Sequence, residues 1–187
     1  MRVFIAIPIE NVLKDNIAKI TKNIMNTSVK IKWVEYENYH LTLKFLGDVS
    51  VSQTEKVMKN LKNVSQNCPP YEMILQNLGF FPNNKKPKVV WMGIKEGIPR
   101  IRRHSELVDN AVAPLGFEKE RRPVFHLTLG RIRSDITDGE YIARVEELGK
   151  NMEPVKLNVD RFDLMESRLT SKGPIYTILE EYKMDGN

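Results

Sequence analysis

The sequence is poor in the side chains that bind metals and form disulfides. Among its 187 residues there is one cysteine, Cys68, and there are three histidines. A lone cysteine forms no internal disulfide and leaves a paired-cysteine zinc site incomplete. HExxH and H-x-H motifs are absent, and two histidines alone make a poor zinc site. We therefore expect no metal, no other cofactor and, because disulfides belong to oxidising compartments, a cytoplasmic location.

Long hydrophobic runs are missing as well. No apolar run approaches the roughly 20 residues with which a helix crosses a bilayer, so a transmembrane span is excluded. The N-terminal segment MRVFIAIPIENVLKDN has a short apolar run, but acidic and polar residues follow where a signal peptide needs small ones. It is therefore predicted to begin with a strand. The composition, 41% hydrophobic and 28% charged, is that of a globular protein with a core.

The excess of positive charge is small. The net charge is +5, from 29 basic and 24 acidic residues. This favours an anionic partner only weakly, because the clusters RIRRH (100–104) and EKERR (118–122) fit a solvated helix face as well as a phosphate-binding groove.

Hydrophobic periodicity predicts alternating strands and helices. Strands are expected at 2–9, 31–47, 71–81, 88–94, 125–133, 155–169 and 175–183, and helices at 10–25, 54–64, 98–113 and 139–150. The order strand, helix, strand, helix, strand occurs twice. We therefore predict one α+β domain, residues 1–187, built from two related halves at about 1–87 and 88–187.

The tetrapeptide HLTL occurs at 40–43 and again at 126–129, 86 positions later, and each copy begins at one of the three histidines. Side chains alternate between the two faces of a strand, so each copy sends its histidine and threonine to one face and its leucines to the other. The leucines suit a core beneath helices. If an approximate two-fold axis relates the halves, the two polar faces converge on one cleft.

This cleft would contain the imidazoles of His40 and His126 and the hydroxyls of Thr42 and Thr128. These groups suit phosphate-ester chemistry without a metal. Histidine has an ordinary pKa of about 6.5, so one ring can accept a proton while the other donates one. The threonine hydroxyls can donate hydrogen bonds to phosphate oxygens. A purely structural role for the histidines, bonded to nearby carbonyls, is the alternative, but two identical copies in matching places favour a function.

Three other side chains have expected positions relative to these motifs. His104 is expected to be a surface residue of a helix. Lys44 shares the face of His40 if the strand stays regular, as a solvent-facing residue or an anion contact. Strict alternation puts Arg131 on the leucine face, but a bulge at Gly130 would turn it toward His126 as a phosphate contact.

Several segments together resemble the two-histidine (2H) phosphoesterases, most of all their RNA 2′,3′-cyclic phosphodiesterase branch, also described as 2′-5′ RNA ligase. The resemblance covers nearly the whole chain and lies in RVFIAI, HLTLKFLGDV, KVVWMGI, FHLTLGRIR and LMESRLTSKGPIY. It implies a bilobal, pseudo-two-fold α+β fold, with antiparallel sheets, outer helices and a central cleft.

The resemblance also implies an activity and roles. The family hydrolyses a 2′,3′-cyclic phosphate on RNA or a nucleotide, leaving a 2′-phosphate, without a metal. His40 matches the proton donor to the leaving 3′ oxygen, His126 the group that activates water, and Arg131 a phosphate-contacting arginine. The reverse reaction, 2′-5′ ligation, uses the same groups.

Alternatives remain open at this stage. One is a module that binds RNA ends or nucleotide phosphates without turning them over. Others are phosphodiesterases for 2′-5′ oligonucleotides or ADP-ribose cyclic phosphate. The expected partners are RNA ends or nucleotides with a cyclic phosphate. No membrane and no obligate protein partner are expected, and a monomer is the default.

Overall fold

The structure, a computed structural model, describes residues 1–25, 29–134, 139–171 and 173–186. It confirms the predicted α+β class. In chain order the elements are β1 (Arg2–Pro8), α1 (Asn11–Ile24), β2 (Ile31–Trp33), η1 (Tyr36–Asn38), β3 (His40–Asp48), α2 (Val51–Asn67), β4 (Tyr71–Phe81), β5 (Val89–Glu96), α3 (Ile98–Val112), η2 (Ala113–Leu115), β6 (Leu127–Ile132), α4 (Gly139–Asn151), β7 (Val155–Val159), β8 (Arg161–Leu169) and β9 (Pro174–Lys183).

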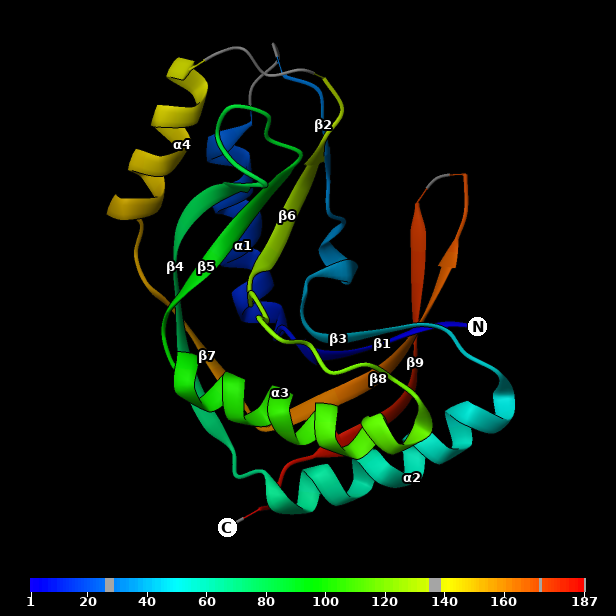
Figure 1. Cartoon of the computed structure of the whole chain (residues 1–187). Helices are drawn as coiled ribbons and strands as arrows, with labels where there is room; N and C mark the ends of the chain where they lie inside the picture. Colours follow the sequence, from blue (N-terminus) through cyan, green and yellow to red (C-terminus); the bar gives the residue numbers. More distant parts are fainter. Residues whose placement is uncertain (26–28, 135–138, 172, 187) are drawn as a thin grey trace.

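The strands form one sheet in the order β7-β4-β5-β6-β3-β1-β8-β9, with β2 paired to β6 (Figure 1). All strand pairs are antiparallel. At the centre, β3 and β6 pair through Leu41 and Leu127. The sheet is therefore two lobes joined at a narrow seam: the β6 lobe (β7, β4, β5, β6) and the β3 lobe (β3, β1, β8, β9).

Each lobe contains strands from both halves of the sequence. The β6 lobe contains β4 from the first half, and the β3 lobe contains β8 and β9 from the second. Counted outward from the seam, the β6 lobe contains β6, β5, β4 and β7, and the β3 lobe contains β3, β1, β8 and β9. Each of these strands has a counterpart at the same place in the other lobe, and β2 has none. This order is consistent with a duplicated unit, and the boundary near residue 87 stays a prediction.

The helices cover the outside of the sheet. Helices α2 and α3 pack against each other beneath the β3 lobe, and α1 and α4 lie behind the β6 lobe (Figure 1). Helix α2 begins with a capping box, in which Ser50 and Gln53 each bond the other's backbone N–H. No helix among the described residues combines the length and apolar composition needed to cross a membrane.

Two predicted strands are interrupted. The segment 31–47 contains the short helix η1 between β2 and β3. The segment 155–169 divides at Asp160, because β7 pairs with β4 in one lobe and β8 pairs with β1 in the other. The chain crosses between lobes at that residue, so a single straight strand cannot serve both.

The prediction that His104 lies on the surface is wrong. Its side chain is 0% exposed, its Nδ1 lies 3.1 Å from the Tyr71 hydroxyl, and its ring centroid lies 4.8 Å from that of Phe162. The reason is its place on α3, where it shares a buried stripe with Ile101 and Val108 at helical spacing.

Candidate active site

The seam between the lobes places the four motif side chains on one side of the sheet. Opposed residues of an antiparallel pair project to the same side, and their chain neighbours project to the other. Because the central leucines of β3 and β6 are opposed and fully buried, His40, Thr42, His126 and Thr128 share the opposite side. We call this side the motif face. The two histidines are diagonal neighbours across the seam, at a spacing of roughly 7–8 Å.

Both imidazoles are held in the same way. His40 Nδ1 lies 2.7 Å from the Asn38 carbonyl oxygen, and His126 Nδ1 lies 3.0 Å from that of Val124. A carbonyl only accepts, so each Nδ1 carries a hydrogen. Each Nε2 is then the nitrogen that gains or loses the proton. In the structure, the Thr42 hydroxyl lies 3.1 Å from His40 Nε2 and donates to it when the ring is neutral.

An aromatic ring fixes the plane of each imidazole. Tyr176 of β9 meets His40 edge to face, with centroids 5.2 Å apart and planes at 84°. Phe81 of β4 meets His126 in the same way, at 4.8 Å and 74°. Each lobe therefore supplies one aromatic support to its imidazole, from β9 in the β3 lobe and from β4 in the β6 lobe, although these two strands do not occupy matching places in the sheet.

The surroundings of both imidazoles disfavour the charged form. Burial lowers the pKa of His40 to about 4, the Lys14 ammonium also lowers it, and the bond to Asn38 opposes them. Burial lowers the pKa of His126 too, and the Arg131 guanidinium adds to the effect. Both rings are thus neutral near pH 7. An anion bound between them would favour protonation of one ring.

Each HLTL strand contains a bulge directly after its threonine. In β3, Thr42 pairs with Ala6 and Lys44 with Ile5, so Leu43 is the extra residue. In β6, Leu129 is extra in the register with β5, which runs from Thr128 to Gly130. A bulge reverses the alternation that follows it. In both strands the residues directly after the bulge therefore project to the opposite face from the one that strict alternation gives.

The bulge turns Arg131 to the motif face. Gly130 is buried and Arg131 is exposed, the reverse of the order that strict alternation gives. The guanidinium lies near enough to lower the pKa of His126. Burial raises the pKa of Tyr176, and the charges of Arg131 and Arg2 oppose that rise. Arg131 therefore lies near both His126 and Tyr176, the residue that contacts His40.

The same device moves Lys44 away from the site, so its expected place on the face of His40 is wrong. Lys44 is 8% exposed. Its Nζ lies 2.5 Å from Asp109 Oδ1 of α3 and 2.6 Å from the Glu118 carbonyl oxygen. The bulge at Leu43 is the physical cause, because it reverses the alternation at Lys44, which pairs with the buried Ile5.

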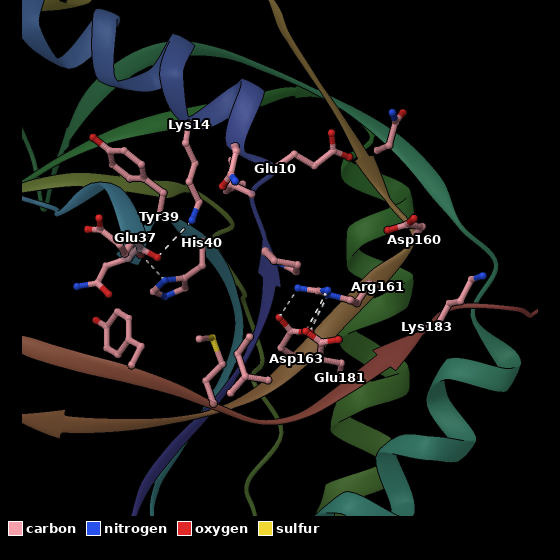
Figure 2. A pocket seen from close by; sticks show the side chains of 18 residues that line it. Glu10, Lys14, Glu37, Tyr39, His40, Asp160, Arg161, Asp163, Glu181 and Lys183 are labelled. Atoms are coloured by element: carbon pink, nitrogen blue, oxygen red, sulfur yellow. Dashed lines mark hydrogen bonds and ion pairs between the residues drawn. The ribbon is translucent and has the colours of Figure 1, made fainter.

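A pocket of about 780 Å³ opens beside His40 on the motif face of the β3 lobe (Figure 2). Figure 2 shows Arg161 between two carboxylates: its Nε lies 3.1 Å from Asp163 Oδ1 and its Nη1 lies 3.0 Å from Glu181 Oε1. Burial raises the pKa of Asp163 to about 6, although the Arg161 charge opposes the rise. Five carboxylates and three cations line the pocket: Glu10, Glu37, Asp160, Asp163, Glu181, Lys14, Arg161 and Lys183.

The acidic side chains of this pocket are spread along its wall. Over the residues that the structure describes, no three histidine, cysteine, aspartate or glutamate side chains are grouped so that they could hold a metal ion. Within the pocket, Arg161 instead pairs with two of the carboxylates.

The sequence reasoning missed Tyr176, which contacts His40 from 136 positions away. Its only signal was its place at the end of LMESRLTSKGPIY, one of the segments on which the family resemblance depended. Phe81 ends a predicted strand, and nothing in the sequence marks it as a neighbour of His126. The carbonyls of Asn38 and Val124 carry no side-chain signal at all.

Comparison with known proteins identifies the family of the chain. The family model described as LigT-like phosphoesterase matches the chain twice, over residues 7–91 and 93–176. The chain is 31% identical over 186 residues to the RNA 2′,3′-cyclic phosphodiesterase of Methanothermobacter thermautotrophicus, covering 98% of this chain and 99% of the relative. It is 33% identical over 183 residues to that of Methanocaldococcus jannaschii, covering 97% and 100%. The protein of the same name from Aquifex aeolicus shares 33% identity with this chain over 174 residues, with 92% of each covered.

Solved structures share the fold. A Thermus thermophilus protein superimposes with a TM-score of 0.82 at 23% identity, over 100% of this chain and 99% of its own. E. coli LigT complexed with 3′-AMP superimposes with a TM-score of 0.75 at 21% identity, over 98% and 97%.

Proposed function

The chain belongs to the LigT-like phosphoesterase family, and from this premise we propose that it is a metal-independent hydrolase of RNA or nucleotide 2′,3′-cyclic phosphates that leaves a 2′-phosphate. One observation carries the proposal. Two identical H-x-T segments meet on one face of the sheet, each with its imidazole held at Nδ1 and its Nε2 available for proton transfer. The names of the full-length relatives support the substrate class.

The geometry suits a reaction with the two rings on opposite sides of phosphorus. His126 Nε2 accepts a proton from water, and the water oxygen forms the new bond to phosphorus. The bond between phosphorus and the 3′ oxygen breaks, and His40 Nε2 donates a proton to that oxygen. In-line displacement needs the entering and leaving oxygens on opposite sides, which the diagonal placement of the rings provides.

The remaining groups act on the phosphate itself. The hydroxyls of Thr42 and Thr128 donate hydrogen bonds to its non-bridging oxygens, where negative charge develops. Arg131 supplies a positive charge on the same face. With a 5′-hydroxyl in place of water, the same displacement would form a 2′-5′ bond: His126 would accept the proton of the 5′-hydroxyl, the bond between phosphorus and the 3′ oxygen would break, and His40 would protonate that oxygen.

The proposal includes the organisation of the chain. We propose a single domain, residues 1–187, of two related halves at about 1–87 and 88–187, which the two separate matches of the family model support. A monomer that acts in the cytoplasm is the accompanying expectation.

A direct assay tests the function. The protein is incubated with a nucleoside 2′,3′-cyclic phosphate in the presence and absence of a chelator, and the products are identified by phosphorus NMR. The 2′-phosphate monoester should form at the same rate in both samples. Tight binding without product would favour the binding module instead. Turnover only of 2′-5′ oligonucleotides or of ADP-ribose cyclic phosphate would favour those alternative substrates.

Removal of either threonine hydroxyl should slow catalysis without disturbing the fold. Thr42→Val and Thr128→Val keep the shape of the side chain, and each is expected to lower kcat by about 10²- to 10³-fold, the effect of losing one donor to a charged oxygen. Steady-state kinetics measure the loss, and circular dichroism with thermal unfolding checks the structure. A kcat within twofold of the unaltered protein would contradict the assigned role.

The pH dependence follows from the lowered imidazole pKa values. The reactive form has His40 protonated and His126 neutral, and its population is greatest midway between their two pKa values. Burial puts both pKa values below 6.5. The maximum of kcat/KM, which reports the free enzyme, should therefore lie below pH 6.5.

The profile of kcat supplies the matching control. A bound phosphate anion favours protonated His40, so the maximum of kcat should lie at higher pH than that of kcat/KM. Initial rates across pH 4–9 at constant ionic strength measure both profiles. A kcat/KM maximum above pH 7 would contradict the neutral imidazoles of the structure.

A further inference from the structure

The two HLTL strands continue differently after their matching bulges. After the bulge in β6, two exposed arginines project to the motif face: Arg131 within the strand and Arg133 directly after its end. In β3, the residues at the same distance from the motif are Phe45 and Gly47. At these two positions only the strand of the second motif carries positive charge. The pairing of the two strands at the seam does not explain this difference.

Strand β2 lies beside β6 (Figure 1), and Lys32 in β2 and Lys30 directly before it add two more positive charges. Lys32 lies directly opposite Arg131, and the Arg133 N–H donates to the Lys30 carbonyl oxygen at 2.7 Å. Lys30 and Lys32 are two positions apart, and so are the arginines, so all four project to one side. Like charges directly opposite each other in a sheet are destabilising. We call these four exposed side chains the basic ladder.

The basic ladder is continuous with the candidate active site. Its inner member, Arg131, lies close enough to lower the pKa of His126. Lys32 reaches across toward the β3 lobe: a Cβ added at Gly173, in the β8–β9 turn, would lie 2.9 Å from Lys32 Nζ and 3.6 Å from Glu35 Oε1. The ladder therefore leads from the site along β6, with Glu35 as the carboxylate beside Lys32.

The other route out of the site has a different electrostatic character. The pocket beside His40 is lined by five carboxylates against three cations. A chain of phosphates is repelled by such a wall and attracted by the basic ladder. The charge distribution thus distinguishes the two directions in which a long substrate can extend.

We propose that the basic ladder binds the phosphodiester backbone of a single-stranded RNA whose cyclic-phosphate end lies between the two histidines, so that the preferred substrate is an oligonucleotide rather than a free mononucleotide. Successive rungs on one strand are about 7 Å apart, since a strand advances roughly 3.4 Å per residue, which matches neighbouring phosphates of an extended strand. This inference depends on the proposed function, because it concerns the same site.

The test compares two substrates that differ only in length. They are an RNA tetranucleotide with a 2′,3′-cyclic phosphate and the nucleoside cyclic phosphate of the same terminal base. At low salt, kcat/KM should be at least about tenfold higher for the tetranucleotide. Its logarithm should fall with the logarithm of salt concentration, with a slope of about 0.7 for each phosphate contacted.

Variants locate the effect on the ladder. In Lys30→Gln/Arg133→Gln, the ratio of the two kcat/KM values should fall about tenfold, and the salt slope for the tetranucleotide should decrease by about 1.4. The matched control is Lys59→Gln/Lys62→Gln, which removes the same charge from exposed positions on α2. This control should keep the ratio of the unaltered protein.

The outcomes separate the two proposals. Failure to hydrolyse either substrate would overturn the proposed function. Equal kcat/KM values for the two substrates, or the same loss in the ladder variant and the α2 control, would overturn the basic ladder as an RNA site while leaving the proposed function in place.

Discussion

His40→Ala and His126→Ala are each expected to lower kcat on a nucleoside 2′,3′-cyclic phosphate by about 10²- to 10⁴-fold, the usual contribution of one positioned acid or base. Each variant removes the only Nε2 on its side of phosphorus. Neither ring is deep in the core, and each bonds one local carbonyl, so the fold should persist. Steady-state kinetics, with thermal unfolding as the check on structure, measure the effect.

The pH profiles distinguish a chemical role from a structural one. The base must be neutral, so loss of His126 should flatten the acidic limb of the kcat/KM profile. The acid must be protonated, so loss of His40 should flatten the basic limb. Near-full activity in either variant would refute the assignment. So would a kcat/KM profile that is lower in both variants but keeps both its acidic and its basic limb.

The second large effect concerns stability. Lys44→Met is expected to lower the free energy of unfolding by about 3–5 kcal/mol, because it leaves the Asp109 carboxylate charged in a buried site without its partner. The ammonium and carboxylate are only 7% and 9% exposed, and their nearest atoms lie 2.5 Å apart. Urea denaturation at pH 7, monitored by tryptophan fluorescence, measures the loss.

A double variant separates the lost charge pair from lost packing. In Lys44→Met/Asp109→Asn the buried charge is gone, and the amide oxygen can still accept from the Glu120 N–H, which lies 3.0 Å from Asp109 Oδ2. Most of the stability should return. If the double variant is as unstable as Lys44→Met, the packing of the lysine stem and not the unpaired carboxylate is responsible.

The period-two pattern predicts much of the site because it depends only on neighbouring residues. It separates His40 and Thr42 from their leucines before any strand pairing is known. It fails where a bulge reverses the alternation. Gly130 gives a sign of the bulge in β6, but the matching position in β3 is Lys44, and no glycine marks the irregularity there. The repeat itself was the usable signal, since a bulge in one copy predicts a bulge in the other.

Contacts between distant segments were beyond the sequence for a different reason. Tyr176 contacts His40 because β8 and β9 join the sheet beside β1. Hydrophobic periodicity predicts strands but not the order in which they pair. For His104, helical spacing from Ile101 and Val108 pointed to the buried face. In the structure the Tyr71 hydroxyl pairs with Nδ1 of His104 and Phe162 packs against its ring, while its buried Nε2 has no hydrogen-bond partner among the described residues.

The mixed origin of the lobes has a consequence for fragments of the chain. Strand β4 pairs with β5, and β8 pairs with β1, so a long strand of each sequence half adds to the sheet of the other. A polypeptide of one half would expose an unpaired hydrophobic edge. Two copies would cover that edge by reciprocal exchange, and a strand-swapped homodimer is therefore the form in which a half-length precursor would be stable.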